Sequence, residues 1–345
     1  MAAYSLLSPN QASAPLRLVD SHGRSIHDLR VSITDRCNYK CIYCRTGEVG
    51  AQYPELRIDE YLRLIELFVS LGITKVRLTG GEPLLRRGLL DLVRALAQLR
   101  TVDGSRLDLA LTTNGHLLEG LAEPLKSAGL GRITVSMDAV EEPVFERITR
   151  VPGSFKAVLA GVRAARAAGL APVKINCVLL RGFNDGQIEG FARFALEEQV
   201  AVRFIEFMPL EEDRLWSPDL VVPLREILDR LGATFSLAPL PSRDPSETAR
   251  RYGFGEGHGE IGIIAPVSQA FCGACSRVRL TSDGKIRTCL FSQAEHDLYG
   301  RMRAGESDTE LRGYIVRTIL GKEARHHIGE PEFLKPSRSM VHIGG

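Results

Sequence analysis

Short apolar or alternating segments recur along the first two thirds of the chain, separated by amphipathic stretches. Each segment concentrates apolar and β-branched residues over a length typical of a strand. The predicted strands are 29–34 (LRVSIT), 75–79 (KVRLT), 107–112 (LDLALT), 132–137 (RITVSM), 173–180 (VKINCVLL) and 202–208 (VRFIEFM).

The intervening stretches place apolar residues three and four positions apart, which predicts helices. Several end at glycine, a common residue after a helix. Six strand–helix units in series predict right-handed crossovers and a parallel sheet. Because eight units close a full barrel, we expect an α/β fold, an incomplete (β/α)6 TIM-like barrel with an open side; a doubly wound sheet is the alternative. The predicted helices are 59–72, 89–100, 117–129, 154–169, 186–199 and 224–232.

The composition divides the chain into three parts. Residues 1–16 carry no charged side chain and no basic signal-peptide region, which predicts a flexible N-terminal tail. Residues 17–238 hold the barrel units, and we expect 239–345 to form a smaller C-terminal domain covering the open side. Proline, glycine and charged residues at 238–262 predict a linker and a mobile loop. The GHGEIG within it fits a dinucleotide-binding pattern, but no predicted strand precedes it, so we interpret it as loop.

The 345 residues have the composition of a folded globular protein, with 44% hydrophobic residues to fill a core. The 44 basic residues nearly balance the 42 acidic ones, so any nucleotide site must be local. The longest uncharged stretch that could suggest a membrane, 261–276, is too short to span one. We therefore expect a cytoplasmic protein with no nucleic-acid or membrane partner.

Seven cysteines in a chain without an export signal indicate metal binding rather than disulfides. Cys177 stands alone in a predicted strand and is expected to be buried. The others form two groups of three: Cys37, Cys41 and Cys44, and Cys272, Cys275 and Cys289.

The first cysteine group follows the first predicted strand with the spacing C-x3-C-x2-C, at the end of the sheet where α/β proteins build active sites. Structural zinc needs four protein ligands, and the nearest other candidate, His27, lies before the strand. A 4Fe-4S cluster on three cysteines keeps one iron open for a small molecule. The second group, C-x2-C-x13-C, would alone favour a zinc ribbon; beside the first it favours a second cluster.

Basic side chains share faces of several predicted strands, since residues two apart point the same way. A single strand arginine is ordinarily exposed or ion-paired. Several inside a barrel are costly to bury without a bound anion, which a triphosphate would supply. The residues are Arg30, Lys75, Arg77, Lys174, Arg277 and Arg279.

The first cysteine group also carries a family resemblance. C-x3-C-x2-C with Tyr43 before its last cysteine, and TGGEP at 79–83, resemble the radical S-adenosylmethionine enzymes. This resemblance implies a partial barrel and an open iron that chelates S-adenosylmethionine for cleavage to a 5'-deoxyadenosyl radical. Glycines in such a turn let backbone approach the methionine amino group closely.

From about residue 16 to its end, the chain is similar to the GTP 3',8-cyclase family, also called molybdenum cofactor biosynthesis protein A. The similarity rests on DLRVSITDRCNYKCIYC, KVRLTGGEP, TTNG, RFIEFMP, the second cysteine group and the final Gly344-Gly345. It implies two 4Fe-4S clusters, the second binding the guanine of GTP, and conversion of GTP to (8S)-3',8-cyclo-7,8-dihydroguanosine 5'-triphosphate, early in molybdenum cofactor biosynthesis. It further implies an electron donor, a homodimer and a Gly-Gly end that reaches the active site.

The same resemblance assigns binding positions. No acid or base is assigned as catalytic, because the radical arises at the first cluster. Asp138 is expected to contact a ribose or the cofactor. The sequences YCRTG and SMDAV depart from the commonest family pattern and affect only local loop conformation. The positions for S-adenosylmethionine are Tyr43, Gly81, Ser136 and Met208. Those for GTP are Arg30, Lys75, Arg77, Thr112, Lys174, Arg277, Val278 and Arg279.

Two alternative functions remain. One is another radical S-adenosylmethionine enzyme with an auxiliary cluster, such as a peptide-modifying one, although seven cysteines are few for that pattern. The other is a non-catalytic zinc protein that binds nucleic acid, which balanced charge and only 6% aromatic residues disfavour. Two four-iron clusters give about eight irons per chain, so metal content separates the enzyme from the zinc protein.

Overall fold

The computed structural model describes residues 17–44, 51–212, 215–255 and 259–343. The predicted N-terminal tail and the Gly-Gly end lie outside the described residues. All six predicted strands are confirmed, with ends shifted by a residue or two. They are β3 (Asp28–Ser32), β4 (Lys75–Thr79), β5 (Asp108–Thr113), β6 (Arg132–Ser136), β7 (Val173–Leu179) and β8 (Ala201–Glu206).

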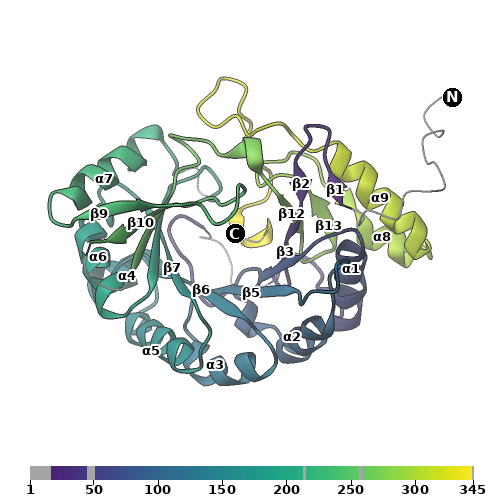
Figure 1. The fold of residues 1–345 in the computed structure, drawn as a ribbon, viewed down its shortest axis with the longest axis horizontal. Coiled ribbons are helices and arrows are strands. Elements are labelled where there is room, and N and C mark those ends of the chain that lie inside the picture. Colours follow the sequence, from purple (N-terminus) through teal and green to yellow (C-terminus); the bar gives the residue numbers. More distant parts are fainter. Residues whose placement is uncertain (1–16, 45–50, 213–214, 256–258, 344–345) are drawn as a thin grey trace.

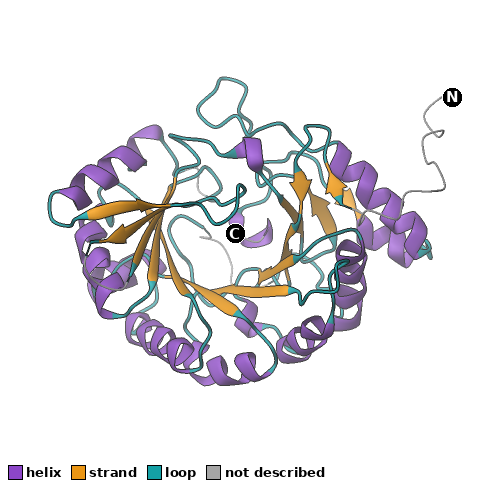
Figure 2. Cartoon of the chain, in the orientation of Figure 1, coloured by secondary structure: helices purple, strands orange, loops and turns teal. Residues whose placement is uncertain are grey.

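Strands β3 to β8 lie side by side in chain order and are all parallel. A helix follows each strand and covers the outer face of the sheet, while the inner face curves around residues 340–343 (Figures 1 and 2). Because all six strands run the same way, the loops at their carboxyl ends meet on one side.

The six predicted helices are also confirmed. The pattern does not predict α4 (Glu142–Thr149), which is short and buries only Phe145, Ile148 and Thr149, too few residues to show a helical period. The confirmed helices are α1 (Ile58–Ser70), α2 (Leu89–Gln98), α3 (Leu118–Ser127), α5 (Ser154–Ala167), α6 (Ile188–Glu197) and α7 (Leu224–Gly232).

The prediction of a linker and loop at 238–262 is wrong. This segment contributes most of β9 (Leu237–Leu240), β10 (Arg250–Phe254) and part of β11 (Glu260–Ile264). β11 pairs in parallel with β8, and β10 and β9 add antiparallel strands out to the sheet edge, where proline is tolerated. The loop interpretation of GHGEIG is wrong for its last three residues, 260–262, which lie in β11. A Cβ on Gly262 would come within 3.1 Å of the Arg203 side chain.

The last third of the chain also extends the opposite edge of the sheet. β12 (Arg277–Leu280) pairs in parallel with β3, and β13 (Lys285–Arg287) and β14 (His296–Asp297) follow antiparallel. Among the described residues this makes a twelve-stranded sheet in the order β14-β13-β12-β3-β4-β5-β6-β7-β8-β11-β10-β9. The remaining elements are the β1 (Leu18–Val19) and β2 (Ser25–Ile26) hairpin, α8 (Leu298–Arg303), α9 (Asp308–Leu320) and α10 (Met340–Ile343).

The two faces of the sheet differ in composition. The outer face buries Leu29, Val31 and Val76 completely. Since neighbours along a strand alternate, Arg30 and Arg77 point to the inner face. The core therefore packs between sheet and helices, and polar side chains converge on the concave side. None of the described helices combines the length and apolar character needed to cross a membrane.

Candidate active site

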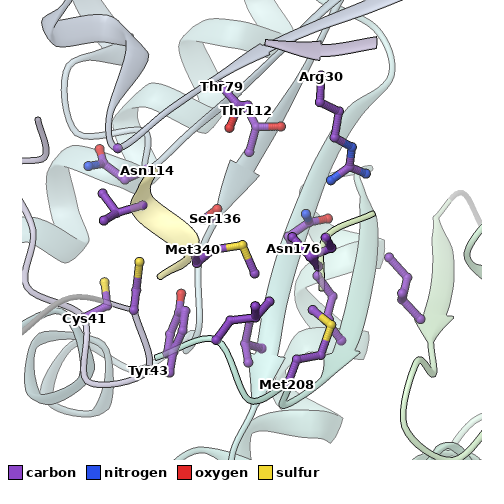
Figure 3. A pocket seen from close by; sticks show the side chains of 18 of the residues that line it. Arg30, Cys41, Tyr43, Thr79, Thr112, Asn114, Ser136, Asn176, Met208 and Met340 are labelled. Carbon is purple, nitrogen blue, oxygen red and sulfur yellow. The ribbon is translucent and has the colours of Figure 1, made fainter. Parts of the chain in front are cut away.

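A cavity of about 240 Å³ lies at the carboxyl ends of the parallel strands. All three cysteines of the first group line it. In Figure 3, Cys41 and Tyr43 occupy one end, Arg30 and Thr112 occupy the other, and Ser136 lies between them. A thiol-rich end and a cationic end thus face the same space.

The three thiols of the first group lie close enough to influence one another. Burial raises the pKa of the Cys41 thiol well above its usual value, and negative charge on Asp138, Cys44 and Cys37 raises it further. The Asn114 amide donates to the Cys37 sulfur over 3.9 Å. Three thiolates in one half-buried loop are unfavourable unless cations lie among them, and iron supplies that charge. The loop therefore fits an iron–sulfur cluster.

Two backbone hydrogen bonds join the TGGEP turn after β4 to the cysteine loop after β3. Gly81 N–H donates to the Thr34 carbonyl at 2.8 Å, and Glu82 N–H donates to the Arg36 carbonyl at 2.7 Å. A Cβ on Gly80 or Gly81 would lie 2.3 Å from one of those carbonyl oxygens. Only glycine permits this approach. Gly81 also lines the cavity. Its contact with S-adenosylmethionine stays a prediction.

The Glu82 carboxylate ties β4 to the next loop. It accepts hydrogen bonds from Leu84 N–H at 2.8 Å, Thr113 Oγ1 at 2.7 Å and Asn114 N–H at 2.6 Å. Burial raises the pKa of Glu82 to about 7, and these three hydrogen bonds oppose that shift. The carboxylate thereby fixes Asn114, which contacts the sulfur of Cys37.

Tyr43 is held by Asp138 at the end of β6. The Tyr43 hydroxyl donates to Asp138 Oδ2 at 2.6 Å, and Val178 N–H donates to Asp138 Oδ1 at 2.8 Å. Burial raises the pKa of Asp138 to about 6, which the two hydrogen bonds oppose. Asp138 lines the cavity, and its predicted contact with a ribose or the cofactor stays a prediction. Its hydrogen bonds in the described residues are to protein groups, and the one from Tyr43 positions that ring.

The second cysteine group lies beside the same cavity. Its own cysteines do not line the wall, although the neighbouring Phe271, Arg277 and Leu290 do. Burial disfavours ionisation of Cys275, yet the Arg277 and Lys322 cations lower the pKa of its thiol to about 7. One half-buried and one buried cation beside thiols suit an anionic cluster.

In the described residues, neither cysteine group is arranged in space as a single zinc ion requires. In the described stretches of the chain, no three His, Cys, Asp or Glu side chains converge as closely as one metal ion requires. A cube of four irons and four sulfides holds its thiolates farther apart than a single ion does. The geometry therefore gives no support to the zinc alternative.

Three arginines lie in register across neighbouring strands. Arg279 on β12 is opposite Arg30 on β3, and Arg30 is opposite Arg77 on β4. Burial, together with the positive charge of Arg30, lowers the pKa of Arg77 to about 9. Arg77 Nη1 donates to Thr112 Oγ1 at 3.0 Å and to Thr134 Oγ1 at 3.1 Å, neither of which is charged. A row of buried guanidinium groups is costly without nearby negative charge, of which the Asp28 carboxylate supplies part.

A second cationic cluster extends from this row along β7 and β8. Burial lowers the pKa of Lys174 to about 7, and the positive charges of Arg203, Arg132 and Arg77 contribute. Arg30 Nε, Asn176 Oδ1 and Arg203 Nε are buried without a hydrogen-bond partner among the described residues. Buried polar atoms without partners indicate a polar ligand.

The structure brings most of the predicted site residues to one cavity. The four predicted S-adenosylmethionine positions all line it, as do Arg30, Thr112, Arg277 and Arg279 of the GTP set. Four GTP positions do not line it. Arg77 donates to the lining residue Thr112, and Lys174 lies two residues before the lining residue Asn176 on β7. Val278 is buried in the core, and Lys75 Nζ lies 3.9 Å from Asp28 Oδ2.

The sequence reasoning missed several residues of this site. Arg203 shares a strand face with Ile205, which lines the cavity, so the alternation in VRFIEFM was a usable signal. Asn114 lies in TTNG, which was noted only as part of the resemblance. Met340 and Val341 also line the cavity, and nothing in their sequence indicates this.

The C-terminal segment is anchored beside the cavity by Arg338. Its guanidinium donates to Asp283 at 2.9 Å through two nitrogens and to Glu295 at 2.7 Å, and it stacks 3.9 Å from the centre of the Tyr53 ring. Arg279 Nη1 donates to the Ile343 carbonyl at 3.3 Å.

Arg338→Met is expected to loosen this segment. The partly buried carboxylates of Asp283 and Glu295 would lose one of the cations that pair with them and would keep Lys285 as a partner. Amide hydrogen exchange at residues 339–343 should accelerate by about tenfold or more. The control is Arg63→Met, which removes an exposed ion pair to Asp308 at 2.8 Å. Exchange measured by mass spectrometry should not change at 339–343 in the control. Equal protection in Arg338→Met and the parent protein would contradict the anchoring role.

Comparison with known proteins agrees with this geometry. Residues 31–195 match the radical SAM superfamily, and residues 200–328 match Molybdenum Cofactor Synthesis C. The chain is 44% identical to the GTP 3',8-cyclase of Mycolicibacterium smegmatis, over 98% of this chain and 94% of the relative. It is 42% identical to that of Rhodopirellula baltica, over 98% and 94%. The structure of Streptococcus suis SuiB bound to S-adenosylmethionine has a similar fold, with a TM-score of 0.59, 14% identity and coverage of 92% and 78%.

The fold and the cysteine loop at the carboxyl ends of its strands define a radical S-adenosylmethionine enzyme. This class holds a 4Fe-4S cluster and S-adenosylmethionine. Within it, the chain belongs to the GTP 3',8-cyclase family. Family membership decides among the alternatives left open by the sequence and excludes the zinc protein and the peptide-modifying enzyme.

Proposed function

We propose that this protein converts GTP to (8S)-3',8-cyclo-7,8-dihydroguanosine 5'-triphosphate in molybdenum cofactor biosynthesis. One observation carries the proposal: the in-register row of Arg279, Arg30 and Arg77 lies on the inner face of the sheet whose loops carry the first cysteine group. A triphosphate on the arginines would direct its nucleoside toward Cys37, Cys41 and Cys44.

The protein's own residues bind, orient and protect the substrate. The cationic cluster holds the phosphates, and Tyr43, Gly81, Ser136 and Met208 form the S-adenosylmethionine site near the cysteines. When bound, the first cluster supplies an electron that cleaves S-adenosylmethionine to the radical that removes hydrogen from C3' of GTP. Apolar wall residues such as Ile205 and Phe207 exclude water while C3' bonds to guanine C8. A second electron, from an external electron donor, and a proton complete the product.

The finer parts of the proposal extend the same reasoning. Cys272, Cys275 and Cys289 hold a second 4Fe-4S cluster that binds guanine, supported by the cations beside them. The curved sheet of residues 17–238 acts as an incomplete (β/α)6 barrel, and residues 239–345 as the C-terminal domain that covers it. An external electron donor, a homodimer and a cytoplasmic location complete the proposal.

The direct test of activity is anaerobic. The reconstituted protein is incubated with GTP, S-adenosylmethionine and a reductant, and the products are separated by liquid chromatography and identified by tandem mass spectrometry. We expect a cyclic nucleotide isomeric with GTP, and equal amounts of 5'-deoxyadenosine and methionine. Unchanged GTP alongside abundant 5'-deoxyadenosine would contradict the assigned substrate.

Lys174 predicts a pH-dependent step in GTP binding. With its pKa lowered to about 7, Lys174 is mostly neutral in the free protein at pH 8. A bound triphosphate raises that pKa, so binding at pH 8 should take up close to one proton, and affinity should fall as the pH rises above 7. Calorimetry in buffers of different ionisation enthalpy measures this uptake.

The control for the Lys174 prediction is Lys174→Arg, which stays charged at every pH used. It should bind GTP with little proton uptake at pH 8. Lys174→Met should bind more weakly and also lose the uptake. Proton uptake that persists undiminished in Lys174→Arg would assign the effect to another group.

A further inference from the structure

The two ends of the second cysteine group are held by one short segment after α9. Figure 1 shows α9 beside the β1–β2 hairpin. The segment comprises Lys322, Glu323 and Ala324, and begins where Lys322 N–H donates to the Ile319 carbonyl at 3.0 Å. None of these residues touches the cavity described above.

On the side of Cys289, the segment forms hydrogen bonds with Thr288, the residue before this cysteine. Lys322 Nζ donates to the Thr288 carbonyl, and Thr288 Oγ1 donates to the Glu323 carboxylate at 2.7 Å. Both the backbone and the side chain of Thr288 are therefore fixed, which determines the position of Cys289.

On the side of Cys272, the segment acts through Arg24. Arg24 Nη1 donates to the Cys272 carbonyl at 2.9 Å and to the Ala324 carbonyl at 2.7 Å, and Arg24 Nη2 donates to the Glu323 carbonyl at 2.6 Å. Asp20 pairs with Arg24 at 2.6 Å and keeps it in place. One segment thus links two cysteines that are far apart in sequence.

The Lys322 ammonium is buried, with the residue only 3% exposed. No salt bridge joins Lys322 to a carboxylate in the described part of the chain, and its hydrogen bond to the Thr288 carbonyl places the ammonium next to the residue before Cys289. A buried ammonium needs negative charge nearby, and thiolates of a cluster supply it.

From this geometry, and resting on the second cluster of the proposed function, we propose that Lys322 is a positioning residue for that cluster. Its hydrogen bond sets Cys289, and its charge offsets the cluster's negative charge. Because reduction adds an electron, a nearby cation favours the reduced state and raises the reduction potential. Lys322 therefore governs both retention and potential of the second cluster.

The experiment uses the full chain, reconstituted anaerobically, with Lys322→Met, Lys322→Gln and Lys322→Arg. Iron per chain and the potential of each cluster are measured, the latter by electron paramagnetic resonance during reductive titration. Lys322→Met should fall from about eight irons toward about four, while still cleaving S-adenosylmethionine at the first cluster. Lys322→Arg should keep both clusters. The matched control, Arg317→Met, removes an exposed cation from the end of α9 and should change neither quantity.

Lys322→Gln separates the two roles, since its amide can donate to Thr288 without a charge. It should retain the second cluster at a more negative potential, and it decides the question if circular dichroism shows that Lys322→Met is misfolded. If Lys322→Gln, and a folded Lys322→Met, keep the iron content and potential of the parent protein, the role of Lys322 is wrong while the two-cluster proposal stands. A parent protein that holds only four irons would instead overturn the two-cluster proposal and this inference with it.

Discussion

Cys41→Ser is expected to abolish both cleavage of S-adenosylmethionine and formation of the cyclic nucleotide. A serine hydroxyl does not ionise to replace a thiolate ligand, and the first cluster has no cysteine to spare. Single-turnover assays for 5'-deoxyadenosine and cyclic nucleotide measure the two losses, and iron analysis should show that the second cluster remains.

Cys177→Ser provides the matched control for Cys41→Ser. Cys177 is fully buried in β7 and does not line the cavity. Its replacement should lower the free energy of unfolding by about 1–3 kcal/mol, because a hydroxyl is buried, but both clusters and both activities should persist. If Cys177→Ser loses iron as Cys41→Ser does, the ligand assignment of the first group is wrong.

Cys272→Ser is expected to separate cleavage from cyclisation. The first cysteine loop is untouched, so S-adenosylmethionine should still be cleaved, without coupling to GTP. Cyclic nucleotide should fall below detection because guanine loses its proposed anchor. Incubation with GTP, followed by quantification of 5'-deoxyadenosine and cyclic nucleotide, measures the ratio. Full cyclisation by Cys272→Ser would refute the role of the second group.

The parallel strands and their helices could be predicted because the order of apolar and polar residues within each element reflects which of its faces is buried. In β3, Leu29 and Val31 face the helices while Arg30 faces inward, and this alternation is visible in the sequence. The segment at 238–262 has no such pattern. Its β11 is a strand because it pairs with β8, from which it is separated by α7 and two further strands. Long-range pairing overrides the local preference of proline and glycine for loops.

The candidate site divides in the same way. The cysteine spacing and the basic strand residues are local signals, so the sequence alone could predict both groups. Arg203 was missed although its strand was predicted, because one arginine in a strand is ordinarily exposed. Met340 and Val341 could not be found, since their place in the cavity depends on Arg338 and its pairing with Asp283 on another part of the chain. Contacts between distant segments leave no pattern at either segment alone.

The most direct test of the central claim is hydrogen transfer from GTP that carries deuterium at C3'. The account requires that the arginine row and the cysteine loop hold one substrate with C3' beside the deoxyadenosyl carbon. After an anaerobic turnover, mass spectrometry of 5'-deoxyadenosine should show one deuterium gained, with an equal amount of cyclic nucleotide. 5'-Deoxyadenosine that contains no deuterium, alongside cyclic nucleotide that retains it, would contradict the account.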